Sequence, residues 1–237
     1  MKKIICMLLS IVIILSLCGC FSGKSNVVDD TLGEATTEDL TQESSAEEQE
    51  EDLQENQSEF SFGQVENNVY TNEFLGLSCA LPSDWEFYSE EKILELNNIT
   101  KEYIDDDYKE QIENATIIYD MFAQTSKDNI KNINVNLEKL NPVQAALLDI
   151  KSALEAQKEA IISTYQNMGY TNVQVTFQKV IVDNKEYDST KIVAKTQGID
   201  FYAMAFTFKK SDYLVNVTVC SAGKDNTSDI FEYFTIQ

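Results

Sequence analysis

Carboxylates, lysines, tyrosines and cysteines are the titratable side chains available to this chain, because its sequence contains no histidine and no arginine. Without histidine, Ser-His-Asp and Cys-His nucleophiles and histidine-containing zinc sites are excluded. Without arginine, the planar bidentate clamp for carboxylate and phosphate groups is missing. The chemistry that remains is a pair of carboxylates, a lysine or tyrosine base, or a cation held by oxygen ligands.

The densest acidic cluster in the part of the chain that is expected to fold is Asp105-Asp106-Asp107. It lacks the spaced oxygen ligands and the central glycine of a calcium loop, and on a helix its members point in different directions. The sequence also has no glycine-rich phosphate loop, CxxC pair or nucleophile elbow. We therefore expect a solvated helix face at this cluster, and the sequence predicts no catalytic, cofactor-binding or metal-binding residue.

Aromatic residues and a lysine pair are two further candidates for binding. Four aromatic residues can be grouped into a patch for a ligand or partner: Trp85, Tyr88, Tyr103 and Tyr108. Packing in the core, or a hydrophobic lid, is the favoured explanation for them. Lys209-Lys210 is expected at a hairpin tip, where solubility or protection of a strand edge explains it.

The first twenty residues have the pattern of an export signal. Lys2 and Lys3 form a basic head, and an almost purely apolar run from Ile4 to Leu17 follows. That run suits the apolar region of a secretory signal and is short for the roughly 30 Å hydrocarbon core of a bilayer. An uncleaved anchor helix is the alternative interpretation.

The end of this segment, Leu17-Cys18-Gly19-Cys20, resembles the lipobox of bacterial lipoproteins. The resemblance implies that Cys20 carries lipid, that the chain is cut just before it, and that residues 1–20 are the signal peptide. Two or more acyl chains anchor a protein stably. We therefore expect the protein on the extracytoplasmic face of the cell membrane, attached through Cys20.

Residues 21–65 are expected to form a disordered acidic tether, and residues 66–237 a single domain. The first range carries 13 acidic residues and one lysine, with few apolar residues, and the second carries 27 acidic residues and 15 lysines. A segment as polar as the tether cannot bury enough surface to offset the entropy of ordering. Both ranges are acidic, so nucleic acid is not expected as a partner.

Cys79 and Cys220 are the two cysteines of the expected domain. Alternation places Cys79 among the leucines of its strand, whereas Cys220 lies on the side opposite a stripe of valines. Cysteines outside the cytoplasm can pair, since disulfides persist there. A disulfide and two buried free thiols thus both stay open, and free thiols are favoured.

Periodicity predicts an α+β domain built on an antiparallel sheet. Strands are expected within residues 68–71, 74–81, 116–123, 130–140, 173–182, 186–195, 199–208 and 213–219. Helices are expected after Ser89, from Thr100, as one long core-facing helix of about seven turns from Asn141 to Gly169, and over 225–234. Asp120 interrupts an apolar strand and is expected to be exposed or paired, and residues 183–185 are expected to form a turn.

This order of elements resembles the PsbP-like domains, a fold shared with many bacterial lipoproteins. The residues that carry the resemblance are Tyr70-Thr71-Asn72, Leu75-Gly76-Leu77, Leu81-Pro82, Trp85 and the helix from Asn141. The resemblance implies an antiparallel sheet packed between helices, an α/β/α sandwich over roughly residues 67–237. Members of the family are mostly accessory or binding modules without a shared active site.

The sequence therefore predicts a membrane-anchored lipoprotein that acts as a non-catalytic binding or accessory module for another envelope component, not as an enzyme. The alternative is a receptor for a small molecule or an ion, with a pocket between the long helix and the sheet. A third class, an enzyme that uses carboxylates or lysine, requires two titratable groups that converge in a cleft.

Overall fold

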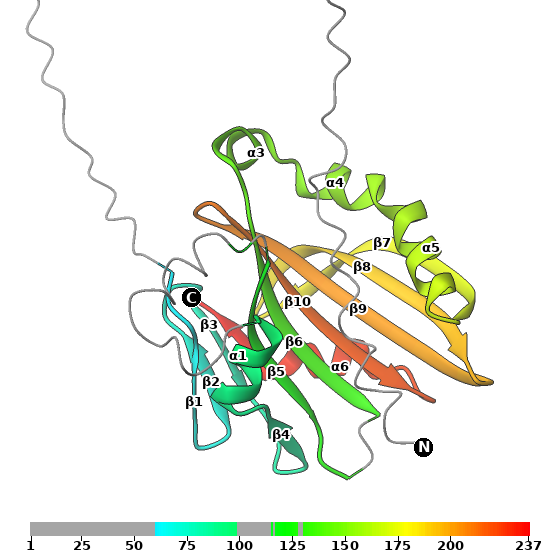
Figure 1. Ribbon diagram of the computed structural model, residues 1–237, viewed down its shortest axis with the longest axis horizontal. Coiled ribbons are helices and arrows are strands. Elements are labelled where there is room, and N and C mark those ends of the chain that lie inside the picture. Colours follow the sequence, from blue (N-terminus) through cyan, green and yellow to red (C-terminus); the bar gives the residue numbers. More distant parts are fainter. Residues whose placement is uncertain (1–59, 99–114, 116, 128–129) are drawn as a thin grey trace, which may run out of the picture. The chain divides into compact units, whose positions relative to one another are not determined.

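The computed structural model describes residues 60–98, 115, 117–127 and 130–237. These residues form two antiparallel sheets and short helices, which confirms the α+β class (Figure 1). Cys20, the Asp105-Asp106-Asp107 cluster, Tyr103, Tyr108 and the helix expected from Thr100 lie outside the described residues. Within the described part of the chain, no helix is both long and apolar enough to cross a membrane.

The larger sheet has the strand order β4-β5-β6-β10-β9-β8-β7, and each neighbouring pair is antiparallel. Its strands are β4 (Trp85–Phe87), β5 (Ile117–Thr125), β6 (Lys131–Lys139), β7 (Thr171–Val182), β8 (Lys185–Thr196), β9 (Ile199–Lys210) and β10 (Tyr213–Ala222). The meander predicted for the last third of the chain is confirmed as β7 to β10. Its first turn has Asp183 and Asn184 at φ 48° and 60°, the left-handed backbone that a two-residue hairpin requires.

The smaller sheet has the order β1-β2-β3-β11, also antiparallel. Its strands are β1 (Gln64–Glu66), β2 (Val69–Asn72), β3 (Leu77–Ala80) and β11 (Phe234–Ile236). The sequence predicted β2 and β3 but neither edge strand. The described fold begins at Phe60, before the expected boundary at residue 66. The helix expected over 225–234 is limited to α6 (Thr227–Ile230) and the 3-10 turn η3 (Phe231–Tyr233), after which the chain becomes extended and pairs with β3.

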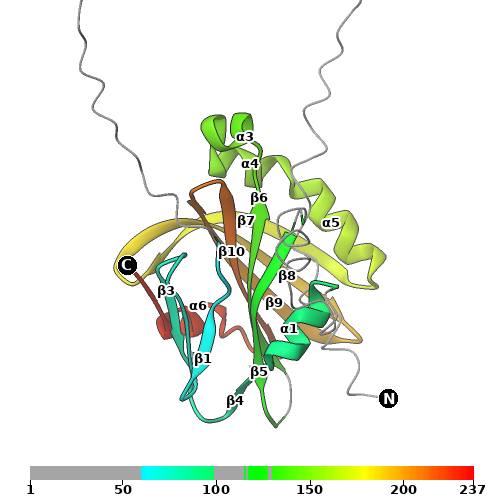
Figure 2. The same ribbon diagram turned by 60° about the vertical axis from the view of Figure 1, so that its left-hand side comes forward.

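The two faces of the larger sheet are covered by different elements (Figure 2), and each face has its own core. On one face, the smaller sheet, α1 (Glu90–Leu96) and α6 pack over the apolar residues of β5, β6, β9 and β10. On the other face, Ile161 and Tyr165 of α5 (Lys158–Asn167) pack on Phe201, Ala203 and Cys220. One of the two covering layers is thus mostly a second sheet, where the family resemblance implied helices.

The single long helix predicted from Asn141 to Gly169 is wrong, because the segment forms three short helices. They are α3 (Pro142–Leu147), α4 (Ile150–Ala156) and α5. Asn141 caps α3 as expected, but Asp149 starts a new helix by accepting a hydrogen bond from the Ser152 amide at 2.8 Å. Leu148 between them has ψ 115°, which is extended. An aspartate offers the backbone a local cap that competes with helix continuation.

The break also changes which apolar residues meet the core. Val143 and Leu147 were expected on the buried face, yet they are 64% and 74% exposed. Leu154, Ile161 and Tyr165 of α4 and α5 are buried as expected. The apolar residues of this segment that are buried in the core therefore all come after the new helix start at Asp149.

Cys79 and Cys220 are both buried free thiols. Cys79 lies in the core under the smaller sheet, and Cys220 lies in the core under α5. The larger sheet separates the two cysteines, so a disulfide between them would need a different fold. The favoured alternative, two free thiols, is confirmed.

Candidate functional site

Asp120 is a buried carboxylate at an irregularity of β5. The register of β5 against β6 shifts between Tyr119 and Met121, which face Asn136 and Val135, so Asp120 is the extra residue of a β-bulge. A bulge redirects side chains locally. Asp120 is 4% exposed and bonds to residues of the smaller sheet, on the side where Met121 enters the core. The sequence predicted that Asp120 is either exposed or paired, and the structure shows that it is paired.

The Asp120 carboxylate accepts three hydrogen bonds from residues distant in the sequence. Oδ1 accepts from the Gly63 amide at 2.8 Å. Oδ2 accepts from Asn72 Nδ2 at 2.7 Å and from the Tyr70 hydroxyl. The carboxylate therefore joins β5 of the larger sheet to β2 of the smaller sheet and to the segment before β1.

Asn72 extends this network to the start of the described fold. Its Nδ2 also donates to the Ser61 carbonyl at 2.9 Å, and its Oδ1 accepts from the Leu75 amide at 2.8 Å. Both ends of the amide are used, so Asn72 cannot rotate without losing bonds on each side. The segment 61–63 is thus held by two independent contacts.

Burial raises the pKa of Asp120, and the hydrogen bonds from Tyr70, Gly63 and Asn72 oppose that shift. Burial and the neighbouring Asp120 also raise the pKa of Tyr70 far above its ordinary value, so Tyr70 remains a donor. A buried polar group with its partners in place is the usual structural arrangement. We therefore assign a structural role to Asp120, which is to hold the two sheets together.

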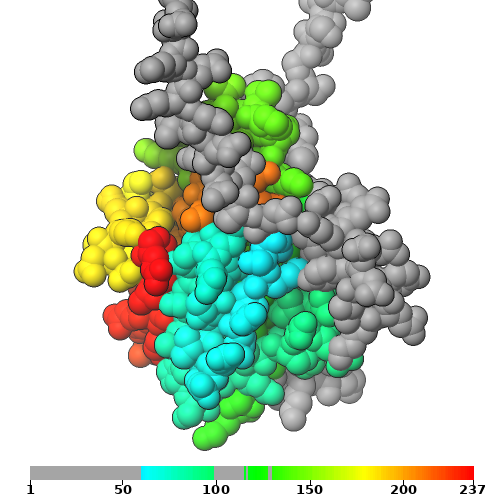
Figure 3. Space-filling model, turned by 90° about the vertical axis from the view of Figure 1, so that its left-hand side faces the viewer, coloured from blue at the N-terminus to red at the C-terminus, as the bar shows by residue number. Residues whose placement is uncertain are grey.

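A hollow of about 660 Å³ lies between three parts of the chain, namely residues 62–66, helix α1 and strand β5. Its lining residues are Phe62, Gly63, Gln64, Val65, Glu66, Phe87, Tyr88, Ser89, Glu90, Ile93, Leu94, Asp120, Met121 and Phe122. The volume is within the range of about 300 to 1,000 Å³ that is usual for ligand sites. The smaller sheet forms much of the surface on this side of the domain (Figure 3).

The described walls of the hollow combine apolar side chains with acids. Phe62, Phe87 and Leu94 are among the apolar residues, whereas Glu66 and Glu90 are exposed acids. No lysine is among the described lining residues, although Lys92 Nζ lies 4.8 Å from the ring centre of Tyr88. Among the described residues, no group of three or more acids and cysteines is placed to hold a metal ion. The arrangement suits binding of a cationic and apolar group.

Another hollow, of about 170 Å³, lies between α4 and strands β7 and β8. Its lining residues are Lys151, Leu154, Phe177, Gln178, Lys179, Asp188 and Ser189. This is the region where the receptor alternative places its pocket. Its volume is below the usual range for ligand sites.

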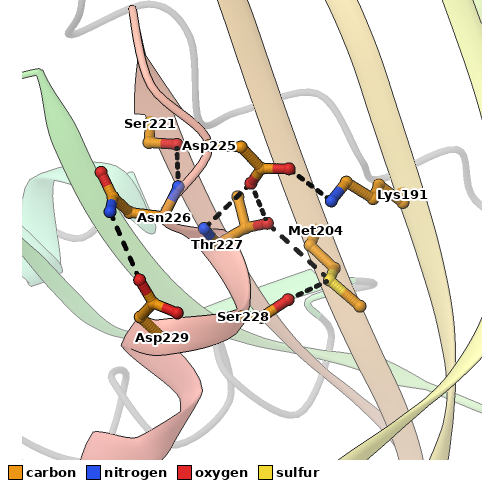
Figure 4. A network of polar contacts seen from close by, with 8 residues as sticks. All are labelled: Lys191, Met204, Ser221, Asp225, Asn226, Thr227, Ser228 and Asp229. Atoms are coloured by element: carbon orange, nitrogen blue, oxygen red, sulfur yellow. Dashed lines mark hydrogen bonds and ion pairs between the residues drawn. The ribbon is translucent and has the colours of Figure 1, made fainter.

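A polar cluster at the end of β10 holds α6 against the larger sheet (Figure 4). Lys191 Nζ lies 2.5 Å from one oxygen of Asp225, whose other oxygen accepts from the Thr227 amide and hydroxyl at 3.2 and 2.7 Å. The hydroxyls of Thr227 and Ser228 lie 3.8 and 4.0 Å from the Met204 sulfur. Burial alone would raise the pKa of Asp225, but the hydrogen bonds from Lys191 and Thr227 outweigh burial, so the pKa is lowered. The cluster is thus accounted for by its structural role, which is to anchor α6.

The candidate binding residues that the sequence suggested, where the structure describes them, lie in different places and have different roles. Trp85 is 5% exposed and packs edge-on against Tyr233 in the core, which confirms the favoured core interpretation. Tyr88 is half-buried, stacks near Phe122 and lines the larger hollow. Lys209 donates from its Nζ to the Ala145 carbonyl and so ties α3 to the β9–β10 hairpin.

Sequence reasoning missed Gly63 and the role of β1. The signal at Asp120 was visible as an acid inside an apolar strand. Gly63 stood in a polar, acidic segment and gave no signal. Glycine is required at position 63 for a steric reason, because a Cβ there would lie 2.2 Å from the Tyr70 ring.

A scan against protein-family models gives no match, and neither does a comparison with curated protein sequences. Among solved structures, the cyanobacterial PsbP of Synechocystis, CyanoP, is 12% identical, with a TM-score of 0.41 over 75% of this chain and 98% of that one. A protein of Bacteroides thetaiotaomicron is 7% identical, with a TM-score of 0.38 over 72% of this chain and 48% of that one.

LpqN of Mycobacterium tuberculosis, a protein involved in cell envelope biogenesis, is 9% identical, with a TM-score of 0.37 over 68% of this chain and 83% of that one. At these scores, the likenesses carry no argument about binding or partners. The site is therefore interpreted from the residues of this chain.

Replacing Gly63 with alanine is expected to destabilise the domain by about 1 to 3 kcal/mol, the usual cost of overpacking. The new methyl group would strike the Tyr70 ring, which the Asp120 hydrogen bond holds in place. Urea unfolding measures the effect. Gln64→Ala, at the exposed neighbouring position, is the matched control and should change stability by less than about 0.5 kcal/mol. Equal effects of the two variants would contradict the steric role of Gly63.

Asp120→Asn is expected to destabilise the domain by about 1 to 3 kcal/mol. The amide has one acceptor oxygen in place of two, so its NH2 group must face either the Gly63 amide or the two donors that bond Oδ2. Since burial raises the pKa of Asp120, its contribution to stability is greatest below its ordinary pKa of 3.8 and is lost as pH rises through the raised value.

The difference in unfolding free energy between wild type and Asp120→Asn should therefore shrink as pH rises over that window. Urea unfolding at a series of pH values measures it, with the exposed Glu86→Gln as the matched control. A difference that widens with pH would show that the hydrogen bonds outweigh burial.

Proposed function

We propose that this chain is a lipoprotein attached through Cys20 to the extracytoplasmic face of the cell membrane, and that its α+β domain is a non-catalytic module that binds another envelope component. The attachment is supported by the basic head, the apolar run and the Leu17-Cys18-Gly19-Cys20 ending. The acidic residues 21–59 would separate the domain from the bilayer.

The observation that carries the binding role is the 660 Å³ hollow beside β1 and α1. It combines apolar walls with exposed acids, as recognition sites do. Its one buried carboxylate, Asp120, already accepts three hydrogen bonds that hold the fold. A carboxylate used in this way supports binding better than it supports acid–base catalysis, which needs a group free to exchange a proton with a substrate.

The receptor alternative has one observation in its favour, the hollow of about 170 Å³ between α4 and the sheet. A pocket of that size would hold only a small ligand or an ion. It is also open to solvent through the exposed Lys151 and Lys179. The binding-module proposal is supported by a larger site and is therefore preferred.

Cys20→Ala is expected to prevent lipid attachment, because the thiol is the acceptor that the lipobox resemblance identifies. The variant should lose incorporation of radiolabelled palmitate and shift from the membrane fraction to the soluble fraction or accumulate as the uncut precursor. Cys18→Ala is the matched control and should retain the label. Unchanged labelling of Cys20→Ala would refute the anchor.

Cross-linking on intact cells, followed by affinity capture and mass spectrometry, tests the binding role. We expect a reproducible envelope component to be captured with the wild-type chain. Capture should survive Glu159→Ala, a substitution at an exposed position of α5 outside the lining of the hollow. An empty capture, beside a positive control, would contradict the binding-module proposal.

A further inference from the structure

Among the described strands, β1 has one edge without a partner strand. It is the terminal strand of the smaller sheet and pairs with β2 alone among the described strands. All three of its residues are exposed, and Val65, an apolar residue, is 45% exposed. A free strand edge offers backbone N–H and C=O groups for pairing with another extended chain.

The free edge of β1 borders the 660 Å³ hollow. Just before β1, where the pairing with β2 begins at Gln64, the Gly63 amide donates to Asp120 on the larger sheet. Because backbone groups alternate along a strand, Val65 is expected to present its N–H and C=O on that same edge. On this edge Asp120 bonds the Gly63 amide, and no described strand pairs with the edge at Val65.

Helix α1 forms the opposite wall. Ser89 caps its start, and Ile93 and Leu94 turn towards the core and the hollow. Met121 and Phe122 of β5 lie at the base. A strand edge facing a helix across an apolar floor is the geometry with which domains bind extended peptides by strand addition.

The charges of the groove favour one kind of occupant. Its described lining includes Glu66 and Glu90 and no lysine. The chain's own residues 21–59, with 13 acidic residues and one lysine, would be repelled, and so would the same acidic edge of a second copy. A segment rich in lysine or arginine would be attracted.

We propose that this groove binds an extended basic segment of a partner protein, in which apolar and cationic residues alternate, by strand addition to the free edge of β1. The apolar side chains enter the hollow, and the cationic side chains meet Glu66 and Glu90. This inference rests on the proposed function, to which it adds the chemistry of the partner and the mode of contact.

The test uses the full-length chain in detergent and a short, end-blocked peptide of alternating valine and lysine, labelled for fluorescence anisotropy. We expect binding that weakens as salt rises, together with slower hydrogen exchange in residues 62–66 and 87–94. The same peptide with glutamate for lysine should not bind. A lysine peptide that is N-methylated at alternate amides should also fail, because it cannot pair with a strand edge.

The matched variants separate local charge from net charge. Glu66→Lys combined with Glu90→Lys should weaken binding of the lysine peptide by about tenfold or more. Glu159→Lys combined with Glu232→Lys makes the same change in net charge at exposed positions outside the lining of the hollow and should bind like wild type. Equal losses in both double variants would overturn the proposal, and so would undiminished binding of the N-methylated peptide.

Two further outcomes distinguish this inference from the proposed function. A photo-cross-linking residue at Val65, compared with one at the exposed Ile181, reports which surface meets a partner in cells. Capture at residue 181 but not at residue 65 would overturn strand addition and leave the binding module intact. Dimers of this chain formed through residue 65 would overturn the basic partner as the occupant.

Discussion

The carboxylate of Asp120 is the contact on which the N-terminal part of the fold depends. It is buried at a β-bulge of the larger sheet, where an unpartnered charge would be costly, and its hydrogen bonds come from β2 and from the Gly63 amide. Residues 61–66 are also held by pairing with β2, by the bond from Asn72 to the Ser61 carbonyl and by packing of Phe62 on the core. Asp120 adds the bond that joins this segment directly to the larger sheet, next to one wall of the hollow.

Much of the fold could be predicted from the sequence because local signals agreed with the final structure. The alternating strands of the meander, the Ser89 cap of α1 and the Asp183-Asn184 turn each depend on nearby residues alone. The long helix failed because a local competitor, the Asp149 cap, lay within a convincing apolar periodicity. Strand β11 was missed because pairing with the distant β3 makes it extended. Strand β1 pairs with the adjacent β2 across the Asn67-Asn68 turn, and it was missed because its residues end a polar, acidic segment.

The candidate site was predictable only in part, for the same reason. Asp120 could be recognised as an acid within an apolar strand. Its hydrogen-bond donors, however, lie about fifty positions earlier in the chain and could not be predicted from it. The groove requires β1, α1 and β5 together, and β1 lay in a segment whose composition indicated disorder. Composition described the acidity of that segment correctly and gave no account of its last residues, which the carboxylate fixes in place.

The most direct test of this account is native-state hydrogen exchange at the Gly63 amide. The hydrogen bond to Asp120 should protect this amide far more than an unstructured chain would, at a level near that of the paired residues of β2. Exchange of the Gly63 amide at the rate of an open chain, with β2 still protected, would show that the segment is not docked. The wall of the groove would then be absent, and the account of the binding site would be wrong.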